Sequence, residues 1–268
     1  MQNSTKLHLD KYYTSEDVAQ HCIDKARQIL KGEKITEVIE PSAGNGVFSK
    51  KINNCIAYDI EPEDNSIIQQ DFFNLDIPYK EGRLFIGNPP FGKGNYLSVK
   101  FFKKCVQLGD YIAFILPISQ LNNNFYMYEF DLIYSEDLGK NQYVDRQIHC
   151  CFNIYKRPIS GINKKEYFEL KDVKLTGVAK GNSRNDKIPI DYDFSISGFG
   201  NSVGKICDTE YQYCQQIYFQ IYKKELKSEI FEFIKNTDWK KLYSMTSTPK
   251  IKHWMIYKLL KENIKNIE

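Results

Sequence analysis

The stretch that decides the fold reads Leu84-Phe85-Ile86-Gly87-Asn88-Pro89-Pro90-Phe91. Its apolar first half predicts a buried strand, and the glycine, asparagine and prolines end that strand in a loop. In an open α/β sheet, loops at the carboxyl ends of the strands bind ligands. Because each proline fixes its own φ and donates no hydrogen bond, the Asn88 amide and the Pro89 carbonyl are held as neighbouring acceptors. Two adjacent acceptors suit a planar NH2 group, which has two protons to donate.

A second junction between a strand and a loop lies earlier in the chain. Residues 36–39 are a short β-prone run, and Glu40-Pro41-Ser42-Ala43-Gly44-Asn45-Gly46 follows it. Glycines at positions 44 and 46 let the backbone approach a ligand closely where a strand passes into a helix. We expect that helix to begin over residues 47–52. The pattern is not the dinucleotide fingerprint, because no third glycine follows, and a plain glycine turn is the alternative interpretation.

Two acidic residues close the next strands. Residues 56–59 predict a strand that ends in Asp59, and an acidic residue at this distance from a glycine loop can bind the hydroxyls of a ribose. Residues 67–71 predict a third strand that ends in Asp71, with an aromatic pair after it. Either carboxylate alone could be a solvated loop residue. The ordered set of Glu40, Asp59, Asp71 and Asn88, each closing a strand, makes the pattern specific.

These segments resemble those of the S-adenosylmethionine-dependent N6-adenine methyltransferases. The Asn-Pro-Pro-Phe stretch at 88–91 resembles their catalytic motif, and residues 40–48 resemble their cofactor loop, Glu-Pro-x-x-Gly-x-Gly-x-Phe. The motif order, with the cofactor loop first and a variable C-terminal region last, is the gamma arrangement of that family. The resemblance covers roughly residues 8–158. It implies an α/β fold with a Rossmann-like class I methyltransferase sheet and a small C-terminal recognition region.

The resemblance also implies roles for individual residues. Phe91 would stack on an adenine extruded from its helix, while Asp59 would bind the ribose of the cofactor and Asp71 its adenine amine. Tyr13 and Thr14 resemble the segment that closes over the methionine end of the cofactor, although the family usually has Pro where this chain has Ser15. The implied catalytic residues are Asn88, Pro89, Pro90 and Phe91. The implied residues for S-adenosyl-L-methionine are Tyr13, Thr14, Glu40, Pro41, Ser42, Gly44, Gly46, Asp59, Ile60, Asp71, Phe72 and Asn88.

Further elements follow from the spacing of apolar residues. We expect Thr14 to cap a helix that ends before Gly32, a helix over 96–108, a buried strand over 111–117 and an edge strand over 147–158. A helix containing Phe125, Tyr128, Leu132 and Ile133 is predicted between these two strands. In the C-terminal part we expect strands over 171–178 and 191–196, a long helix over 211–234 and a last helix over 249–264.

Charge divides the chain into two parts. Residues 1–158 hold 18 Lys and Arg against 20 Asp and Glu, whereas residues 159–268 hold 19 against 14. A basic second part suits a polyanionic partner, although a solvated lysine-rich surface explains the same numbers. We therefore expect residues 1–158 to form the S-adenosylmethionine-binding methyltransferase domain and residues 159–268 to form the target-recognition region.

Composition favours an intracellular enzyme. A chain of 268 residues can bury a substantial core. Its 7 cysteines are scattered without C-x-x-C spacing, which predicts reduced thiols and, together with the unclustered histidines, no metal. We find neither a signal peptide nor an apolar run as long as a membrane span, so the expected location is the cytoplasm.

The function expected from this sequence is site-specific N6-adenine methylation of DNA in a restriction-modification system or a virus. The target base would be flipped out of the duplex, because its amine cannot reach the cofactor from inside the helix. A cognate restriction endonuclease is a candidate partner. Alternatives are an RNA adenine methyltransferase, a release-factor glutamine methyltransferase and a catalytically inactive DNA-binding subunit. Phe91, where release-factor enzymes usually have Tyr, and the intact set of strand-end residues disfavour the last two.

Overall fold

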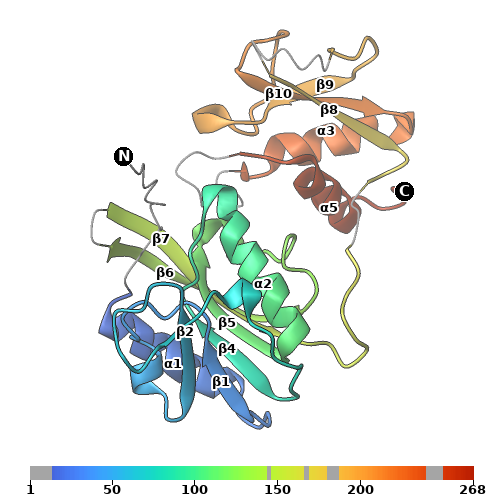
Figure 1. Cartoon of the computed structure of the whole chain (residues 1–268). Coiled ribbons are helices and arrows are strands. Elements are labelled where there is room, and N and C mark those ends of the chain that lie inside the picture. The colour runs from blue at the N-terminus through green and yellow to red at the C-terminus, as the bar shows by residue number, and fades with distance from the viewer. Residues whose placement is uncertain (1–13, 144–145, 166–168, 180–186, 240–249) are drawn as a thin grey trace. The chain divides into compact units, whose positions relative to one another are not determined.

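The computed structural model describes residues 14–143, 146–165, 169–179, 187–239 and 250–268. Tyr13 and the rest of the N-terminal segment lie outside these described residues. The chain divides into two compact units, Met1–Lys165 and Glu166–Glu268 (Figure 1). This division falls a few residues after the predicted boundary at 158, and each unit has its own hydrophobic core.

The first unit is built on a seven-stranded sheet in the order β3-β2-β1-β4-β5-β7-β6. Strand β7 is antiparallel to its neighbours, and the remaining pairs are parallel. Strand β5 and the middle of β4 are apolar on both faces, as expected for strands inside an α/β sheet. The strands are β1 Glu37–Glu40, β2 Cys55–Asp59, β3 Ile68–Gln69, β4 Arg83–Gly87, β5 Tyr111–Pro117, β6 Asp131–Tyr143 and β7 Arg146–Lys156.

This order, in which one antiparallel strand joins an otherwise parallel sheet, gives the α/β fold class that the sequence predicted. The chain runs outward from β1 through β2 to β3 and then returns to place β4 on the other side of β1. The order therefore reverses between β1 and β4. Ligands of open α/β sheets bind in the crevice at such a reversal, outside the carboxyl ends of the strands.

Two helices cover opposite faces of this sheet. Helix α1 (Glu16–Ile29) packs on the face that carries Leu84 and Ile86. Phe85, which lies between them on β4, points to the other face, where Phe72 packs against both Phe85 and Phe101 of helix α2 (Tyr96–Leu108). Helix α2 has the predicted bounds. The N-cap of α1 is Ser15 rather than the predicted Thr14, because its side chain accepts the Val18 N–H at 3.4 Å.

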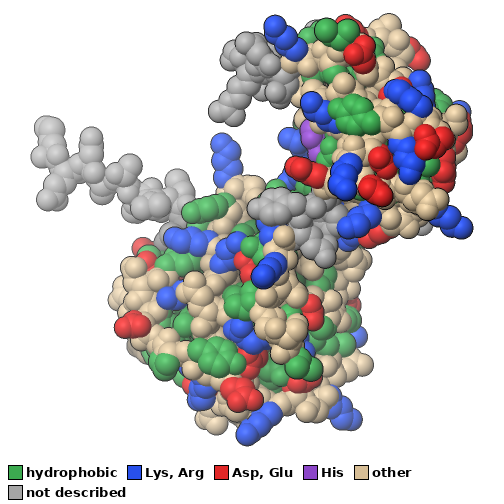
Figure 2. Space-filling view, turned by 90° about the vertical axis from the view of Figure 1, so that its right-hand side faces the viewer, with side chains coloured by type: hydrophobic (Ala, Val, Ile, Leu, Met, Phe, Trp, Pro, Cys, Tyr) green, Lys and Arg blue, Asp and Glu red, His purple; other side chains and the backbone are tan. Residues whose placement is uncertain are grey.

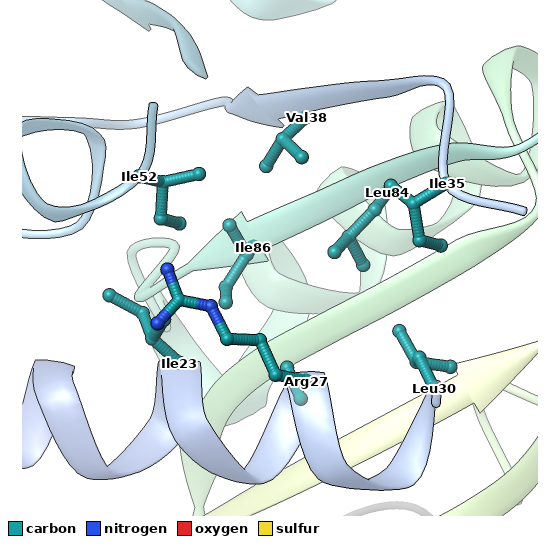
Figure 3. A pocket seen from close by; sticks show the side chains of 9 residues that line it. Ile23, Arg27, Leu30, Ile35, Val38, Ile52, Leu84 and Ile86 are labelled. Carbon is teal, nitrogen blue, oxygen red and sulfur yellow. The ribbon is translucent and has the colours of Figure 1, made fainter. Parts of the chain in front are cut away.

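The helix predicted to begin over residues 47–52 was wrong, since only one 3-10 turn forms, at Ser49–Lys51. The segment between β1 and β2 is too short for a helix that spans the sheet. Consequently α1 leaves part of its face of the sheet open, and a hollow of about 250 Å³ remains there (Figure 3). Its lining is apolar apart from Arg27 and comprises Ile23, Ala26, Arg27, Leu30, Ile35, Val38, Ile52, Leu84 and Ile86.

Two predictions about the end of the first unit were also wrong. The residues predicted as a helix around 125–133 form turns and then strand β6, because residues 131–143 pair along their length with β7. Strand β7 lies between β5 and β6 and is therefore an interior strand, not an edge strand. Its full burial from Cys150 to Tyr155 agrees with this interior position.

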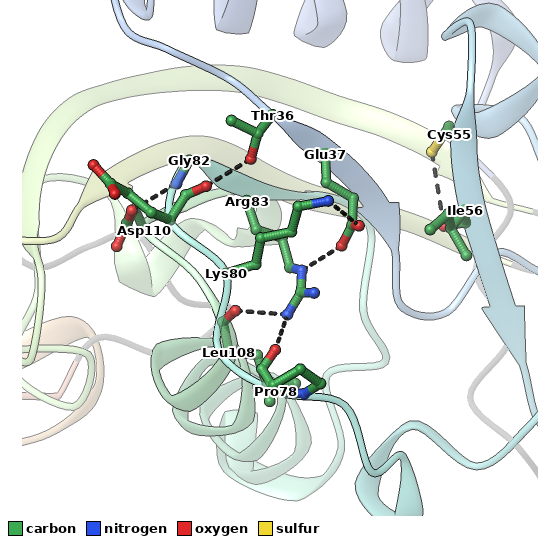
Figure 4. A network of polar contacts seen from close by, with 11 residues as sticks. Thr36, Glu37, Cys55, Ile56, Pro78, Lys80, Gly82, Arg83, Leu108 and Asp110 are labelled. Carbon is green, nitrogen blue, oxygen red and sulfur yellow. Dashed lines mark hydrogen bonds and ion pairs between the residues drawn. The ribbon is translucent and has the colours of Figure 1, made fainter.

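Polar contacts brace the sheet at its amino-terminal edge (Figure 4). Arg83 is only 4% exposed, and its guanidinium donates to the Glu37 carboxylate and to the carbonyl oxygens of Pro78 and Leu108, the last two at 2.7 Å. The Asp110 carboxylate accepts the Gly82 N–H at 2.8 Å. A buried cation with this many acceptors is satisfied in place, so we assign the network a structural role.

The second unit is a three-stranded antiparallel sheet in the order β8-β10-β9, with helices packed on one face. Its elements are β8 Val173–Ala179, β9 Phe194–Ser197, β10 Gln215–Ile221, α3 Lys227–Asn236 and α5 His253–Asn263. The long helix predicted over 211–234 was wrong, because Ile217, Phe219 and Ile221 alternate with polar residues and point into the core. On the face seen in Figure 2, lysines of this unit are interspersed with acidic side chains.

The described residues contain neither a membrane-spanning helix nor a cluster of metal ligands. No helix in that part of the chain is long and apolar enough to cross a membrane. No group of three or more His, Cys, Asp or Glu side chains within the same ranges is arranged to hold a metal ion.

The turn after β9 offers a test of packing in the second unit. A Cβ on Gly204 would lie 2.0 Å from Trp239 Cδ1, and its φ of +80° is unfavourable for any other residue. We expect Gly204→Ala to lower the free energy of unfolding by about 3 kcal/mol, from overpacking and backbone strain together. Gly200 in the same turn has φ +75° with nothing within 4 Å, so Gly200→Ala should cost only about 1 kcal/mol. Urea unfolding measures both, and equal losses would contradict the packing of Trp239 against this turn.

Candidate active site

The predicted site residues meet at the carboxyl edge of the sheet. Glu40, Asp59 and Gly87 are the last residues of β1, β2 and β4, Asn88 follows Gly87, and Asp71 follows β3. Because these strands are parallel neighbours, their ends lie side by side at the point where the strand order reverses. The structure therefore brings together the four residues that the sequence placed at strand ends.

Glu40 is the most buried polar residue of this edge, with 1% exposure. Its carboxylate accepts the Ser49 N–H at 2.8 Å and thereby ties the end of β1 to the 3-10 turn after the glycine loop. A Cβ on Gly87 would lie 3.4 Å from Glu40 Cγ, so the end of β4 packs directly against this side chain. Burial away from water raises the pKa of Glu40 to about 7, although hydrogen bonds from Ser49 and Phe48 oppose the rise.

The glycine loop is held by the second predicted carboxylate. Asp59 accepts the Gly44 N–H through Oδ2 at 2.7 Å and the Glu61 N–H through Oδ1 at 2.8 Å. Gly44 and Gly46 have φ of +55° and +79°, which allows the loop to turn sharply between the buried Pro41 and the 3-10 turn. Each Asp59 oxygen has a second lone-pair site besides the one that this contact uses. Asp59 therefore orders the loop and keeps acceptor capacity for a ligand hydroxyl.

Asp71 has a similar local role after β3. Its two carboxylate oxygens accept the Phe73 N–H and the Asn74 side-chain amide, both at 2.9 Å, and so cap one 3-10 turn. Phe72 is only 2% exposed, and its ring is stacked on Phe101 of α2 with centroids 5.5 Å apart. Phe72 thus contributes to the core beneath the edge. The predicted contacts of Asp71 and Phe72 with a cofactor adenine stay predictions.

Two other predicted residues differ in their exposure. Ile60, directly after Asp59, is 53% exposed, so an apolar surface is available to a flat ring beside the glycine loop. Phe91 is only 7% exposed and belongs to the core cluster that includes Phe48 and residues of α1. The Phe91 ring is therefore inside the protein, and the predicted stacking on a target base requires it to become accessible.

Buried side-chain oxygens at this edge point to a ligand. The Ser42 Oγ atom in the glycine loop and the Gln120 Oε1 atom after β5 are buried and have no hydrogen-bond partner among the described residues. Most buried polar atoms in native proteins are hydrogen-bonded, so such atoms call for an explanation. A polar ligand bound between the ends of β1 and β5 would supply partners for both atoms.

Asn88 is fixed by a contact that the sequence did not reveal. Its side-chain Nδ2 donates to Thr14 Oγ1 at 3.1 Å, and Thr14 is 8% exposed. Because the amide nitrogen donates to Thr14, the amide oxygen points away from Thr14. Pro89 is buried and Pro90 is half-buried, so the backbone that follows is also fixed.

A second tie was missed because it joins two loops. Asn95 Nδ2 donates to Ser119 Oγ at 2.8 Å, which links the loop after β4 to the turn after β5. The only sequence signal is the composition of Gly92-Lys93-Gly94-Asn95, a loop in which left-handed residues are common. Tyr96, the first residue of α2, is 66% exposed and was predicted only as part of a helix.

The arrangement is suited to binding and orientation more than to proton abstraction. Its acceptors are the Asn88 amide oxygen, the Pro89 carbonyl and the carboxylates of Asp59 and Asp71. Glu40 faces the loop N–H groups and is buried, so it supports the backbone instead of reacting. Fixed dipoles of this kind can hold a ligand amine and a nucleoside in defined positions relative to each other.

Comparison with known proteins adds few constraints. No protein-family model matches the chain, and no curated protein matches it in sequence. The candidate RNA methyltransferase PH1948 from Pyrococcus horikoshii is a structural match with 17% identity, a TM-score of 0.43, and coverage of 59% of this chain and 91% of that one. For protein 1320 of Thermoplasma acidophilum the identity is 20%, the TM-score 0.39 and the coverage 56% and 91%.

The 23S rRNA methyltransferase ErmE matches with 12% identity, a TM-score of 0.42 and coverage of 57% of this chain and 72% of its own. Identities and scores this low carry no inference about substrate. The assignment of the fold class therefore rests on the strand order and directions of this chain.

The burial of Glu40 predicts a pH effect on stability. Between about pH 4.5 and 7 the unfolded chain is ionised at Glu40 while the folded protein keeps the proton. This residue therefore lowers the free energy of unfolding as pH rises through that window, by about 3 kcal/mol. Glu40→Gln keeps one acceptor oxygen and cannot ionise. Relative to this variant, the wild type should lose about 3 kcal/mol between pH 4 and pH 8 in urea unfolding.

The exposed Glu81 provides the control, since Glu81→Gln should follow the wild type across the same range. All other carboxylates are common to the wild type and Glu40→Gln, so the contributions of those remote from Glu40 cancel in the difference between the two pH profiles. Parallel pH profiles for these two proteins would contradict the buried position of Glu40.

Proposed function

We propose that this protein is an S-adenosylmethionine-dependent methyltransferase that modifies the N6 amine of adenine in a nucleic acid. The observation that carries the proposal is the position of the Asn88 amide. It lies at the end of β4, where the strand order reverses, and its hydrogen bond to Thr14 fixes its orientation. The oriented Asn88 amide oxygen and the Pro89 carbonyl oxygen are neighbouring acceptors. Together they can accept both protons of one NH2 group.

The residues at the carboxyl edge fit the proposed cofactor. Asp59 offers acceptors for ribose hydroxyls, Ile60 an exposed apolar surface for an adenine ring, and the Ser42 hydroxyl a buried group in need of a partner. Gly44 and Gly46 allow close approach of the loop backbone. S-adenosylmethionine supplies, when bound, a methyl group activated by its sulfonium. Glu40 holds the loop in place through Ser49.

The chemistry required of the protein is orientation. The N6 amine of adenine is a poor nucleophile because its lone pair is delocalised into the ring. If the Asn88 amide oxygen and the Pro89 carbonyl accept both N–H bonds, the nitrogen becomes more pyramidal and its lone pair is freed. Asn88 and Pro89 thus act as fixed dipoles that stabilise the transition state. The methylated, cationic nitrogen then loses one proton to water, so a strong general base is unnecessary.

We propose DNA as the target, in keeping with the gamma motif order and with a C-terminal region that carries 19 Lys and Arg against 14 Asp and Glu. Residues 159–268 would then recognise the target sequence. RNA is the runner-up, since the acceptor pair at Asn88 would serve adenine in either polymer. A catalytically inactive subunit is the third alternative, and it predicts cofactor-independent binding without transfer.

The deciding experiment supplies labelled S-adenosylmethionine together with unmethylated duplex DNA, single-stranded DNA or RNA of matched sequence. Nuclease digestion and chromatography of the nucleosides then identify the labelled product. Label in N6-methyladenosine from the RNA arm alone would exclude the DNA assignment. Absence of label in all three arms would exclude the proposed activity on these nucleic acids.

Removing the Asn88 amide should reduce the rate of transfer. Asn88→Ala deletes one of the two proposed acceptors, whose contact with the amine is strongest in the transition state. We expect kcat to fall roughly 100-fold or more, with little change in cofactor affinity measured by calorimetry. Asn53→Ala, at an exposed position before β2, is the matched control and should keep the wild-type rate. Near wild-type methylation by Asn88→Ala would remove the main support for the proposal.

The contact between Thr14 and Asn88 yields a second kinetic test. Thr14→Val keeps the shape of the side chain and removes the acceptor of the Asn88 amide, so the amide is free to rotate. We expect kcat to fall about tenfold, the equivalent of one hydrogen bond of about 1.4 kcal/mol, with little change in the KM for nucleic acid. Thr14→Ser keeps the hydroxyl and should restore the rate. If the Ser and Val variants were equally slow, the defect would lie in packing and not in orientation.

A further inference from the structure

The loop between the Asn-Pro-Pro-Phe segment and α2 is unusually constrained. Gly92, Gly94 and Asn95 have φ of +66°, +64° and +67°, so three residues within four have positive φ, and Gly94 and Asn95 are left-handed. Asn95 lacks the freedom of glycine, and its side chain is held by Ser119 through a hydrogen bond of 2.8 Å. A Cβ on Gly92 would lie 2.7 Å from Leu97 Cγ, so the loop is also closely packed. Strain of this kind persists where the surrounding structure enforces it, and it concentrates at functional sites.

This loop holds an aromatic side chain in solvent beside the candidate site. The Leu97 N–H donates to the Phe91 carbonyl at 3.1 Å, which brings the start of α2 back to the end of the Asn-Pro-Pro-Phe segment. Tyr96 precedes Leu97 and is 66% exposed, whereas Phe91 is 7% exposed. The exposed aromatic ring of this loop is therefore that of Tyr96.

Two exposed lysines lie close to Tyr96 in the sequence. Lys93 is exposed in the constrained loop, and Lys100 is exposed one turn further along α2. The Lys100 ammonium lies 3.9 Å from the centroid of the Phe73 ring, which follows the Asp71 turn. Exposed aromatic rings with lysines beside them are the composition of surfaces that bind unpaired nucleotides, since bases stack on the rings and phosphates contact the ammonium groups.

We propose that Lys93, Tyr96 and Lys100 form a platform for an unpaired nucleotide next to the target adenine. The inference rests on the proposed function for its location but concerns a separate contact, made by the neighbouring base and its phosphate. Tyr96 stacks on the base, and Lys93 and Lys100 contact the backbone. A base inside a duplex presents no free face to Tyr96, so the platform engages a single strand or a locally opened one.

The test uses short single-stranded oligonucleotides of DNA and of RNA that carry 2-aminopurine next to one adenine. Stacking on Tyr96 quenches the fluorescence of 2-aminopurine, so one titration gives both affinity and contact. Tyr96→Ala should weaken binding roughly tenfold, within the range of one base stacked on an aromatic ring, and should abolish the quench. Tyr96→Trp keeps a ring and should retain both. The two arms show whether the platform prefers DNA or RNA.

A matched pair of lysine variants tests the phosphate contact. Lys93→Ala should weaken binding of the oligonucleotides. The slope of log affinity against log salt concentration should become shallower by about one. Lys34→Ala removes an exposed lysine before β1, at the opposite edge of the sheet, and should leave both quantities unchanged. If both variants weakened binding equally, Lys93 would contribute only general positive charge, and its assignment to the platform would be wrong.

These outcomes separate the platform from the proposed reaction. Unchanged affinity and quench in Tyr96→Ala would overturn the platform even if the wild type methylates adenine. Loss of the quench in Tyr96→Ala, with no methyl transfer by the wild type, would support the platform and reject the proposed activity.

Discussion

The structure depends most on the burial of one carboxylate, that of Glu40. A buried carboxyl group must be compensated, and here hydrogen bonds from Phe48 and from the N–H of Ser49, the latter at 2.8 Å, compensate it and fix the segment after the glycine loop. The same side chain packs against Gly87 at the end of β4. Since the strand order reverses between β1 and β4, Glu40 lies between the glycine loop and the strand end that leads into Asn88.

The connection between β1 and β2 is short, which explains why carboxylate side chains hold the loops at the carboxyl edge of the sheet. Where a longer crossover would place a helix, this chain has one 3-10 turn, and the sheet is left with an apolar hollow of about 250 Å³. Without a helix to position them, the loops are held by side chains: Asp59 accepts the Gly44 N–H, and Asp71 accepts the Phe73 N–H. The hollow itself offers few polar groups and is an unsuitable site for a nucleoside.

The sequence predicted helices and strands well where the spacing of apolar residues fitted only one of the two. Strand β5 and helix α2 have their predicted bounds, because the first is apolar on both faces and the second has one apolar face. Strands β6 and β10 were read as helices, since aromatic residues at mixed spacing hid the alternation of Ile217 and Phe219. Glu40, Asp59, Asp71 and Asn88 were expected at strand ends, and the structure places them there. The contact between Thr14 and Asn88 spans 74 positions of sequence, and no local pattern encodes it.

The burial of Phe91 has an energetic consequence for how a base could be held. Removing a phenylalanine side chain from the core costs about 1.5–3 kcal/mol of hydrophobic free energy, whereas stacking of one base on an aromatic ring returns about 1–3 kcal/mol. Stacking on Phe91 would therefore gain little unless the incoming base replaced the lost core contacts. Tyr96 is exposed at 66%, so stacking on its ring sacrifices no core packing and buries apolar surface that water covers otherwise. The constrained backbone of Gly92, Gly94 and Asn95 leads directly into Tyr96 at the start of α2.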